Sequence, residues 1–142
     1  MKNTKTPTVI TVETTVNVPI EKAWKYWTEP KHIMNWNNAS PDWHTPKSEN
    51  DLKVGGKFSS TMAAKDGSMS FDFGGIYTSI VPNEKIEYTL GDDRKVKIHF
   101  SQTEKGVKIV ESFDAESENP VDMQQGGWQA ILDNFKKYSE AN

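Results

Sequence analysis

The chain has 142 residues, 35% of them hydrophobic, and its 17 basic and 20 acidic side chains give a net charge of −3. It contains no cysteine, which excludes disulfides, thiol nucleophiles and cysteine-ligated metals. It also has no basic run and no apolar stretch near the ~20 residues that cross a bilayer, so neither nucleic-acid binding nor a membrane span is expected.

The N-terminal part contains one predicted strand and two short predicted helices. Residues 1–7 are polar and lack the apolar core of a signal peptide, so a disordered tail and a cytoplasmic location are expected. Residues 9–18 alternate between apolar and polar side chains, which predicts a half-buried strand. Pro19 opens a short helix, Pro30 ends it, and residues 31–36 form a second one. The first helix has one apolar face, formed by Ile20, Ala23, Trp24 and Trp27.

The rest of the chain is predicted to be a loop, a run of strands and a final helix. Residues 37–56, rich in Asn, Ser, Pro and Gly, are expected to form a long loop of the kind that often borders a site. Gly74 and Gly75 predict a bulge or bend that curves the sheet. A helix is predicted over residues 119–138, with Asn119 as its N-cap. Between loop and helix, five strands are predicted at 57–64, 68–81, 85–90, 95–101 and 107–114.

This order of elements predicts an α+β fold in a single domain over residues 8–142. A lone helix after an antiparallel meander must lay its apolar face across the sheet, because neither layer can bury itself alone. We therefore expect a curved six-stranded antiparallel sheet around a long C-terminal helix, with two short helices after the first strand. A curved sheet and its helix would enclose a pocket, which is the natural place for a functional site.

Several segments resemble a known superfamily. They are residues 18–24 (VPIEKAW), Trp36, residues 51–58 (DLKVGGKF), 71–77 (FDFGGIY), 80–88 (IVPNEKIEY) and 127–135, with GW at its start and LDNF at its end. Over about residues 8–140 the chain resembles the SRPBCC, or START-like, helix-grip superfamily, which includes the pollen allergen Bet v 1 and polyketide cyclases. Within it, the chain is most similar to the branch named after the C-terminal domain of the Hsp90 ATPase activator. The resemblance implies the helix-grip fold and leaves the activity open, because lipid carriers, hormone receptors, cyclases and co-chaperones share it.

The predicted pocket wall combines aromatic, apolar and a few polar side chains. Met62 is a soft, adaptable wall residue, and a buried Tyr88 would need a partner for its hydroxyl. Trp128 follows Gly126 and Gly127, where the helix backbone could approach the sheet or bend. No metal site and no cofactor are expected. The candidate ligand-binding residues are Trp36, Trp43, Met62, Phe71, Phe73, Tyr77, Tyr88, Phe100, Glu111, Trp128 and Ile131.

Two titratable residues are weak candidates for catalysis. Strand alternation places Glu111 in an apolar row, where it could be a cavity acid with a raised pKa. A register error of one residue, or a position at the rim beside a lysine, is the alternative and is favoured. His44 beside Trp43 could act as a general base, although an incidental role is favoured. His99 is expected to face solvent, and no Asp-His-Ser spacing is recognisable.

Three functions remain open. The leading hypothesis is a cytoplasmic domain that binds a small hydrophobic or aromatic molecule, as a monomer or weak homodimer. The second is a module that interacts with an Hsp90-type chaperone; we rank it lower because the chain is too short to include the activator's separate N-terminal domain. The third is a cyclase-like or hydrolase-like enzyme that uses Glu111 or His44, and it is less favoured because no triad or metal set accompanies them.

Overall fold

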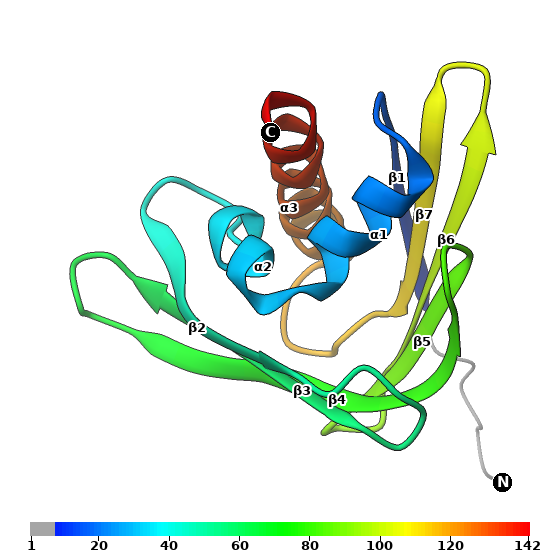
Figure 1. The fold of residues 1–142 in the computed structure, drawn as a ribbon. Coiled ribbons are helices and arrows are strands. Elements are labelled where there is room, and N and C mark those ends of the chain that lie inside the picture. Colours follow the sequence, from blue (N-terminus) through cyan, green and yellow to red (C-terminus); the bar gives the residue numbers. More distant parts are fainter. Residues whose placement is uncertain (1–7) are drawn as a thin grey trace, which may run out of the picture.

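The fold is a strongly curved sheet wrapped around one long helix (Figure 1). A computed structural model of the chain describes residues 8–142, so the predicted disordered tail at 1–7 lies outside the described residues. Within 8–142, seven strands form one antiparallel sheet in the order β1-β7-β6-β5-β4-β3-β2. The strands are β1 (Val9–Val16), β2 (Trp43–Asn50), β3 (Lys57–Ala64), β4 (Ser70–Val81), β5 (Lys85–Leu90), β6 (Lys95–Thr103) and β7 (Gly106–Asp114).

The predicted six-stranded sheet is wrong by one strand, because β2 lies inside the segment predicted to be a loop. Its sequence, WHTPKSEN, offers no alternating apolar row and includes Pro46, which has no N–H for a strand ladder. The strand forms at the edge of the sheet, where it pairs only with β3. The pairing register shifts between His44 and Lys47, around the proline, as edge strands and bulges allow.

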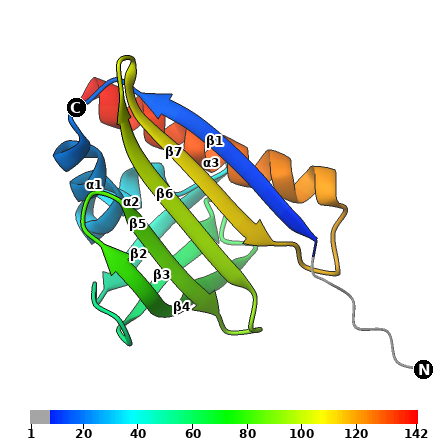
Figure 2. The same ribbon diagram turned by 90° about the vertical axis from the view of Figure 1, so that its right-hand side faces the viewer.

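Three helices cover the concave face of the sheet. The two predicted short helices are confirmed as α1 (Ile20–Thr28) and α2 (Pro30–Trp36), and the long one is α3 (Val121–Ala141). Figures 1 and 2 show α3 crossing the inside of the curved sheet, with α1 and α2 beside its C-terminal half. The predicted N-cap is wrong by one residue: Pro120 is the cap, and the Asn119 carbonyl instead accepts a hydrogen bond from the Gln124 side-chain amide (2.7 Å).

Two glycines of β4 lie where the neighbouring strands come very close to it. A Cβ on Gly74 would lie 2.4 Å from the carbonyl oxygen of Phe58, and one on Gly75 would lie 2.5 Å from that of Thr89. Only glycine therefore allows the neighbouring strands to approach so closely here. The bulge predicted at these glycines is misplaced, because their pairing with β3 is regular and the register shift lies between Tyr77 and Ser79. The predicted curvature is present, since β4 curves along its length (Figure 1).

The core fills the half of the molecule where α3 packs on β1, beside β6 and β7. Alternation along β6 is as predicted, with Ile98 buried and His99 exposed. The other half of the concave face, under β3, β4 and β5, is lined by larger side chains that leave space between them. The core residues of β1, β6, β7 and α3 include Val12, Val16, Ile98, Phe100, Ile109, Phe113, Leu132 and Phe135.

Candidate functional site

A cavity of about 210 Å³ lies between α3 and the sheet, closed at one end by α1 and α2. An apolar cavity of roughly 150 Å³ is enough to hold benzene, so this one has room for a substituted ring. Fifteen residues line it: Trp27, Ile33, Trp36, Asn37, Phe58, Ser60, Met62, Phe71, Phe73, Tyr77, Ile86, Tyr88, Glu111, Trp128 and Ile131.

Aromatic rings form most of the wall, and they hold one another in place. The Trp128 ring stacks on Phe113, with 3.8 Å between centroids and an angle of 12° between planes. On the opposite wall, Phe58 meets Tyr88 edge-on at 4.6 Å. Trp27 packs against Trp36 at 4.9 Å, at the end closed by the short helices. Such contacts limit the freedom of each ring, so the wall is held in place by its own packing.

Among the described lining residues, Glu111 is the one carboxyl group. It lies on β7 between Val12 of β1 and Ile98 of β6, and only 6% of its surface is exposed. The inward orientation that strand alternation predicted is thus correct, and the favoured alternative of a register error or a lysine pair at the rim is wrong. Burial raises the pKa of Glu111 to about 8, so at neutral pH the carboxyl is mostly protonated.

Two tyrosines differ in how their hydroxyls are held. The Tyr77 hydroxyl donates a hydrogen bond to Oδ1 of Asn50 (2.6 Å), whose amide donates to the Thr28 carbonyl (2.6 Å). This connection joins β4, the edge strand β2 and the end of α1. Burial, and then the nearby Glu111, raise the pKa of Tyr88, which keeps its phenol neutral. Within residues 8–142, neither Tyr88 nor Glu111 uses its side-chain oxygens in a hydrogen bond, so both remain available to a ligand.

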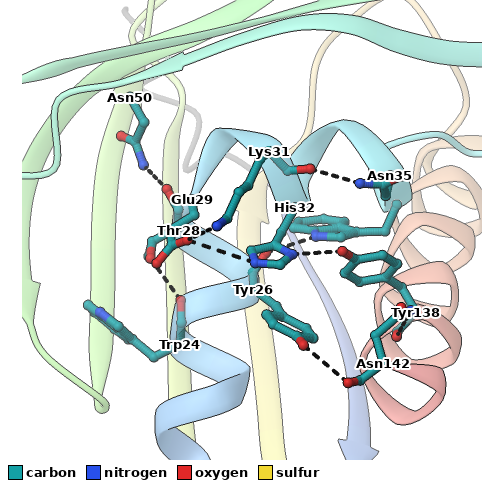
Figure 3. Close-up of polar contacts among 11 residues, drawn as sticks. Trp24, Tyr26, Thr28, Glu29, Lys31, His32, Asn35, Asn50, Tyr138 and Asn142 are labelled. Carbon is teal, nitrogen blue, oxygen red and sulfur yellow. Dashed lines mark hydrogen bonds and ion pairs between the residues drawn. The ribbon is translucent and has the colours of Figure 1, made fainter.

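A polar cluster anchors the α1–α2 corner to the end of α3 (Figure 3). Nδ1 of His32 and the Tyr138 hydroxyl share a hydrogen bond of 2.7 Å, and the imidazole stacks on Tyr26 at 4.1 Å. Burial lowers the pKa of His32, while Glu29, 3.8 Å from Nε2, partly opposes this effect. The ring is therefore held neutral, and the cluster fixes the short helices that close the cavity.

A second hollow of about 360 Å³ adjoins the cavity and shares four wall residues with it, Met62, Phe71, Trp128 and Ile131. It lies between the segment around Trp43, the tips of β3 and β4, and the first turns of α3. Phe71 is 52% exposed and Met123 is 63% exposed, so this hollow opens to solvent. It forms the mouth of the cavity.

The structure brings together most of the predicted site residues. Trp43 lines the mouth instead of the cavity. Phe100 lies in the core, 5.4 Å from the Trp24 ring and 5.7 Å from the Trp27 ring, and lines neither space. His44 is exposed on β2 and also lines neither. The residues that do line the cavity are Trp36, Met62, Phe71, Phe73, Tyr77, Tyr88, Glu111, Trp128 and Ile131.

Six lining residues were not among the candidates, and the sequence contained a signal for most of them. Phe58 and Ser60 share a strand face with Met62, so alternation along β3 would have identified them. Ile86 shares one face of β5 with Tyr88, and Trp27 belongs to the apolar face of α1. Ile33 and Asn37 come from α2 and its C-cap, and only the packing of that helix places them.

Residues 8–142 contain no group of three or more His, Cys, Asp or Glu side chains that could hold a metal ion. None of the three helices found there is long and apolar enough to cross a membrane.

Comparisons with known proteins agree with the fold. No curated protein matches the sequence significantly. An AHSA1-like protein from Aeromonas hydrophila, solved in solution, is 44% identical, with a TM-score of 0.89 over 94% of this chain and 93% of that chain. The protein Chr148 from Cytophaga hutchinsonii is 62% identical, with a TM-score of 0.81 over 94% and 92% of the two chains. Protein CV1439 from Chromobacterium violaceum shares the fold, at 23% identity and a TM-score of 0.86 over 96% and 100%.

The family model described as "Activator of Hsp90 ATPase homolog 1-like protein" matches residues 17–140, which is most of the chain and includes every residue of the cavity wall. The helix-grip architecture expected from the resemblance is present, with seven strands in place of six. The chain belongs to the family of Activator of Hsp90 ATPase homolog 1-like proteins.

Proposed function

We propose that this protein binds a small hydrophobic or aromatic molecule in the cavity between α3 and the sheet. The supporting observation is a preformed, largely apolar space of about 210 Å³, in which two polar groups of the described chain, Glu111 and Tyr88, have no partner. Apolar walls supply affinity, and a few placed polar groups orient the ligand. Neither metal nor covalent chemistry is needed for this function.

The test is a panel of single-ring and two-ring compounds, followed by thermal shift and by NMR shifts of the tryptophan indoles. Binding should move the indole signals of Trp27, Trp36 and Trp128, which line the cavity. A panel in which no compound shifts these signals or raises the melting temperature would contradict the proposal.

A matched pair of substitutions locates the binding site. Ile131 lines both the cavity and its mouth, so Ile131→Phe should occupy space and weaken binding at least tenfold. Ile76 is 45% exposed on β4 and lines neither, so Ile76→Phe makes the same chemical change elsewhere and should leave affinity unchanged. Equal effects of the two substitutions would place the ligand outside the cavity.

A second candidate is a module that docks on an Hsp90-type chaperone, which the family description favours. Exposed apolar side chains at the strand tips and on the first turn of α3, including Met69, Phe71 and Met123, would be the contact surface. Stimulation of Hsp90 ATPase activity by this chain, lost in Met123→Glu, would support this candidate. An enzyme is a third reading; turnover that disappears in Glu111→Gln but persists in His44→Ala would identify the cavity acid as its catalytic group.

A further inference from the structure

We propose that the cavity selects a small organic ammonium with an apolar body, such as an arylalkylamine, over neutral and anionic molecules of the same shape. This ligand class rests on the proposed function and narrows it. The geometry that carries it is one unpaired carboxyl group set in a wall of aromatic rings, with no cationic side chain in the described wall beside it.

The described cavity wall contains one acidic side chain and no basic one. Among the fifteen lining residues that the structure describes, none is lysine, arginine or histidine, and Glu111 is the only acid. Arg94, in the turn between β5 and β6, is already paired with Asp92 at 2.7 Å. An anionic ligand would thus lose its hydration without meeting a cation, which strongly disfavours it.

The other side chains of the described wall are uncharged, and the polar ones among them are Asn37, Ser60, Tyr77 and Tyr88. The strand neighbours of Glu111 are Val12 and Ile98, α3 contributes Trp128 and Ile131 to the same wall, and β4 and β5 contribute Tyr77 and Tyr88. Tyr88 is neutral, and Tyr77 uses its proton in the bond to Asn50. The carboxyl oxygens of Glu111 are therefore free to accept hydrogen bonds from a bound N–H group.

The aromatic wall favours a cation for a second reason. Eight of the fifteen lining side chains are aromatic: Trp27, Trp36, Phe58, Phe71, Phe73, Tyr77, Tyr88 and Trp128. The electron-rich faces of such rings attract ammonium groups, most strongly when water is excluded. Binding must remove water from the ammonium group and also ionise the buried Glu111 carboxyl, and the ring faces together with the new ion pair offset these two costs.

Proton balance distinguishes an amine from a neutral ligand. Without ligand, the pKa of Glu111 is about 8 because the carboxyl is buried, so it carries a proton at pH 7. An alkylamine resembles lysine, whose pKa is about 10.4, and enters as the ammonium ion. Glu111 then releases its proton to solvent and forms a charge-assisted hydrogen bond, roughly twice as strong as the neutral bond that an alcohol would make.

The test uses three probes of similar shape, 2-phenylethylamine, 2-phenylethanol and phenylacetate, titrated at pH 7 by calorimetry. The amine should bind at least tenfold more tightly than the alcohol, and phenylacetate should be weakest. In Glu111→Gln, the preference for amine over alcohol should fall to about one, with alcohol affinity changed less than threefold. Glu104→Gln, which removes an exposed carboxylate from the turn between β6 and β7, should keep the preference.

Proton release from the wild-type protein gives a second readout that requires no substitution. Calorimetry in two buffers of different ionisation enthalpy should detect nearly one proton released per amine bound at pH 7, and none for the alcohol. An amine that binds no more tightly than the alcohol, or binds without releasing a proton, overturns the inference while the proposed function stands. Failure of the whole apolar panel and of all three probes overturns both.

Discussion

Glu111 should make the stability of this protein fall as the pH rises from 5 to 8. Its folded pKa of about 8 lies above the value of 4.5 for a free glutamate, because burial disfavours the charged form. The contribution is fully present below pH 4.5 and is lost as the pH rises through 8. At about 1.4 kcal/mol per pKa unit, the whole contribution is about 5 kcal/mol, of which about 3.5 kcal/mol disappears between pH 5 and pH 8.

The perturbation that isolates this effect is Glu111→Gln, which keeps the size of the side chain and removes its titration. Urea unfolding, followed by tryptophan fluorescence at half-unit steps from pH 5 to 8, measures the free energy of unfolding of both proteins. The free energy of the variant relative to wild type should rise by about 3.5 kcal/mol across this range. Glu104→Gln serves as the exposed control and should follow wild type.

His32 acts in the opposite direction but does not disturb this comparison. Burial lowers the pKa of His32 in the folded protein below the 6.5 of a free histidine. As the pH drops below 6.5, the unfolded chain therefore binds a proton more readily than the folded one, and stability falls. Wild type and Glu111→Gln share this contribution, which cancels in their difference. A variant that retained the wild-type dependence on pH would refute the assignment of Glu111 as a buried, mostly protonated acid.

Three further changes test how the cavity is held, each by urea unfolding at pH 7. Tyr138→Phe removes the hydrogen-bond partner of His32 and should lower the free energy of unfolding by about 1–2 kcal/mol; no loss would mean that the cluster does not anchor α3. Asn50→Ala removes the hydrogen-bond partner of the Tyr77 hydroxyl and of the Thr28 carbonyl, so it should lower the free energy of unfolding by about 2–3 kcal/mol. A negligible loss would mean that Asn50 does not hold these two groups together. Gly126→Ala should stabilise α3 by up to about 1 kcal/mol, because its Cβ would meet no atom within 4 Å. Gly74→Ala should strongly lower the free energy of unfolding, because its Cβ would clash with the Phe58 carbonyl oxygen. The reverse order of the two effects would contradict the described packing.

Local patterns predicted the parts of the fold in which one face is buried. Alternation along β7 placed Glu111 in the wall because a half-buried strand shows its two faces in its sequence. The edge strand β2 has no such pattern, since its residues contact solvent on most sides and Pro46 interrupts its ladder. It forms because β3 has unpaired backbone N–H and C=O groups along its free edge. The reason for this strand therefore lies in the neighbouring strand and not in the sequence of β2 itself.

The wall of the site was predictable to the extent that it follows strand faces. Phe100 belongs to an apolar row as expected, but the rings of Trp24 and Trp27 cover it, so it lies in the core. Of the two alternatives for Gly126 and Gly127, a close approach of the helix backbone to the sheet is wrong, because a Cβ on either glycine would meet no atom within 4 Å. The distance between a helix and a sheet depends on the volumes of all the side chains packed between them. The sequence of a single segment therefore does not predict it.

The two halves of α3 are tied to the rest of the molecule to very different degrees. Towards its C-terminus, Leu132 and Phe135 are fully buried, Lys136 donates to the Thr15 carbonyl (2.7 Å), and Glu140 accepts from the Asn17 N–H (2.8 Å). The first turns contribute the mouth and carry exposed side chains. Substitutions in the walls of the mouth can therefore accumulate at one end of this helix while the other end preserves the fold, which is how one scaffold can diversify among relatives without being rebuilt.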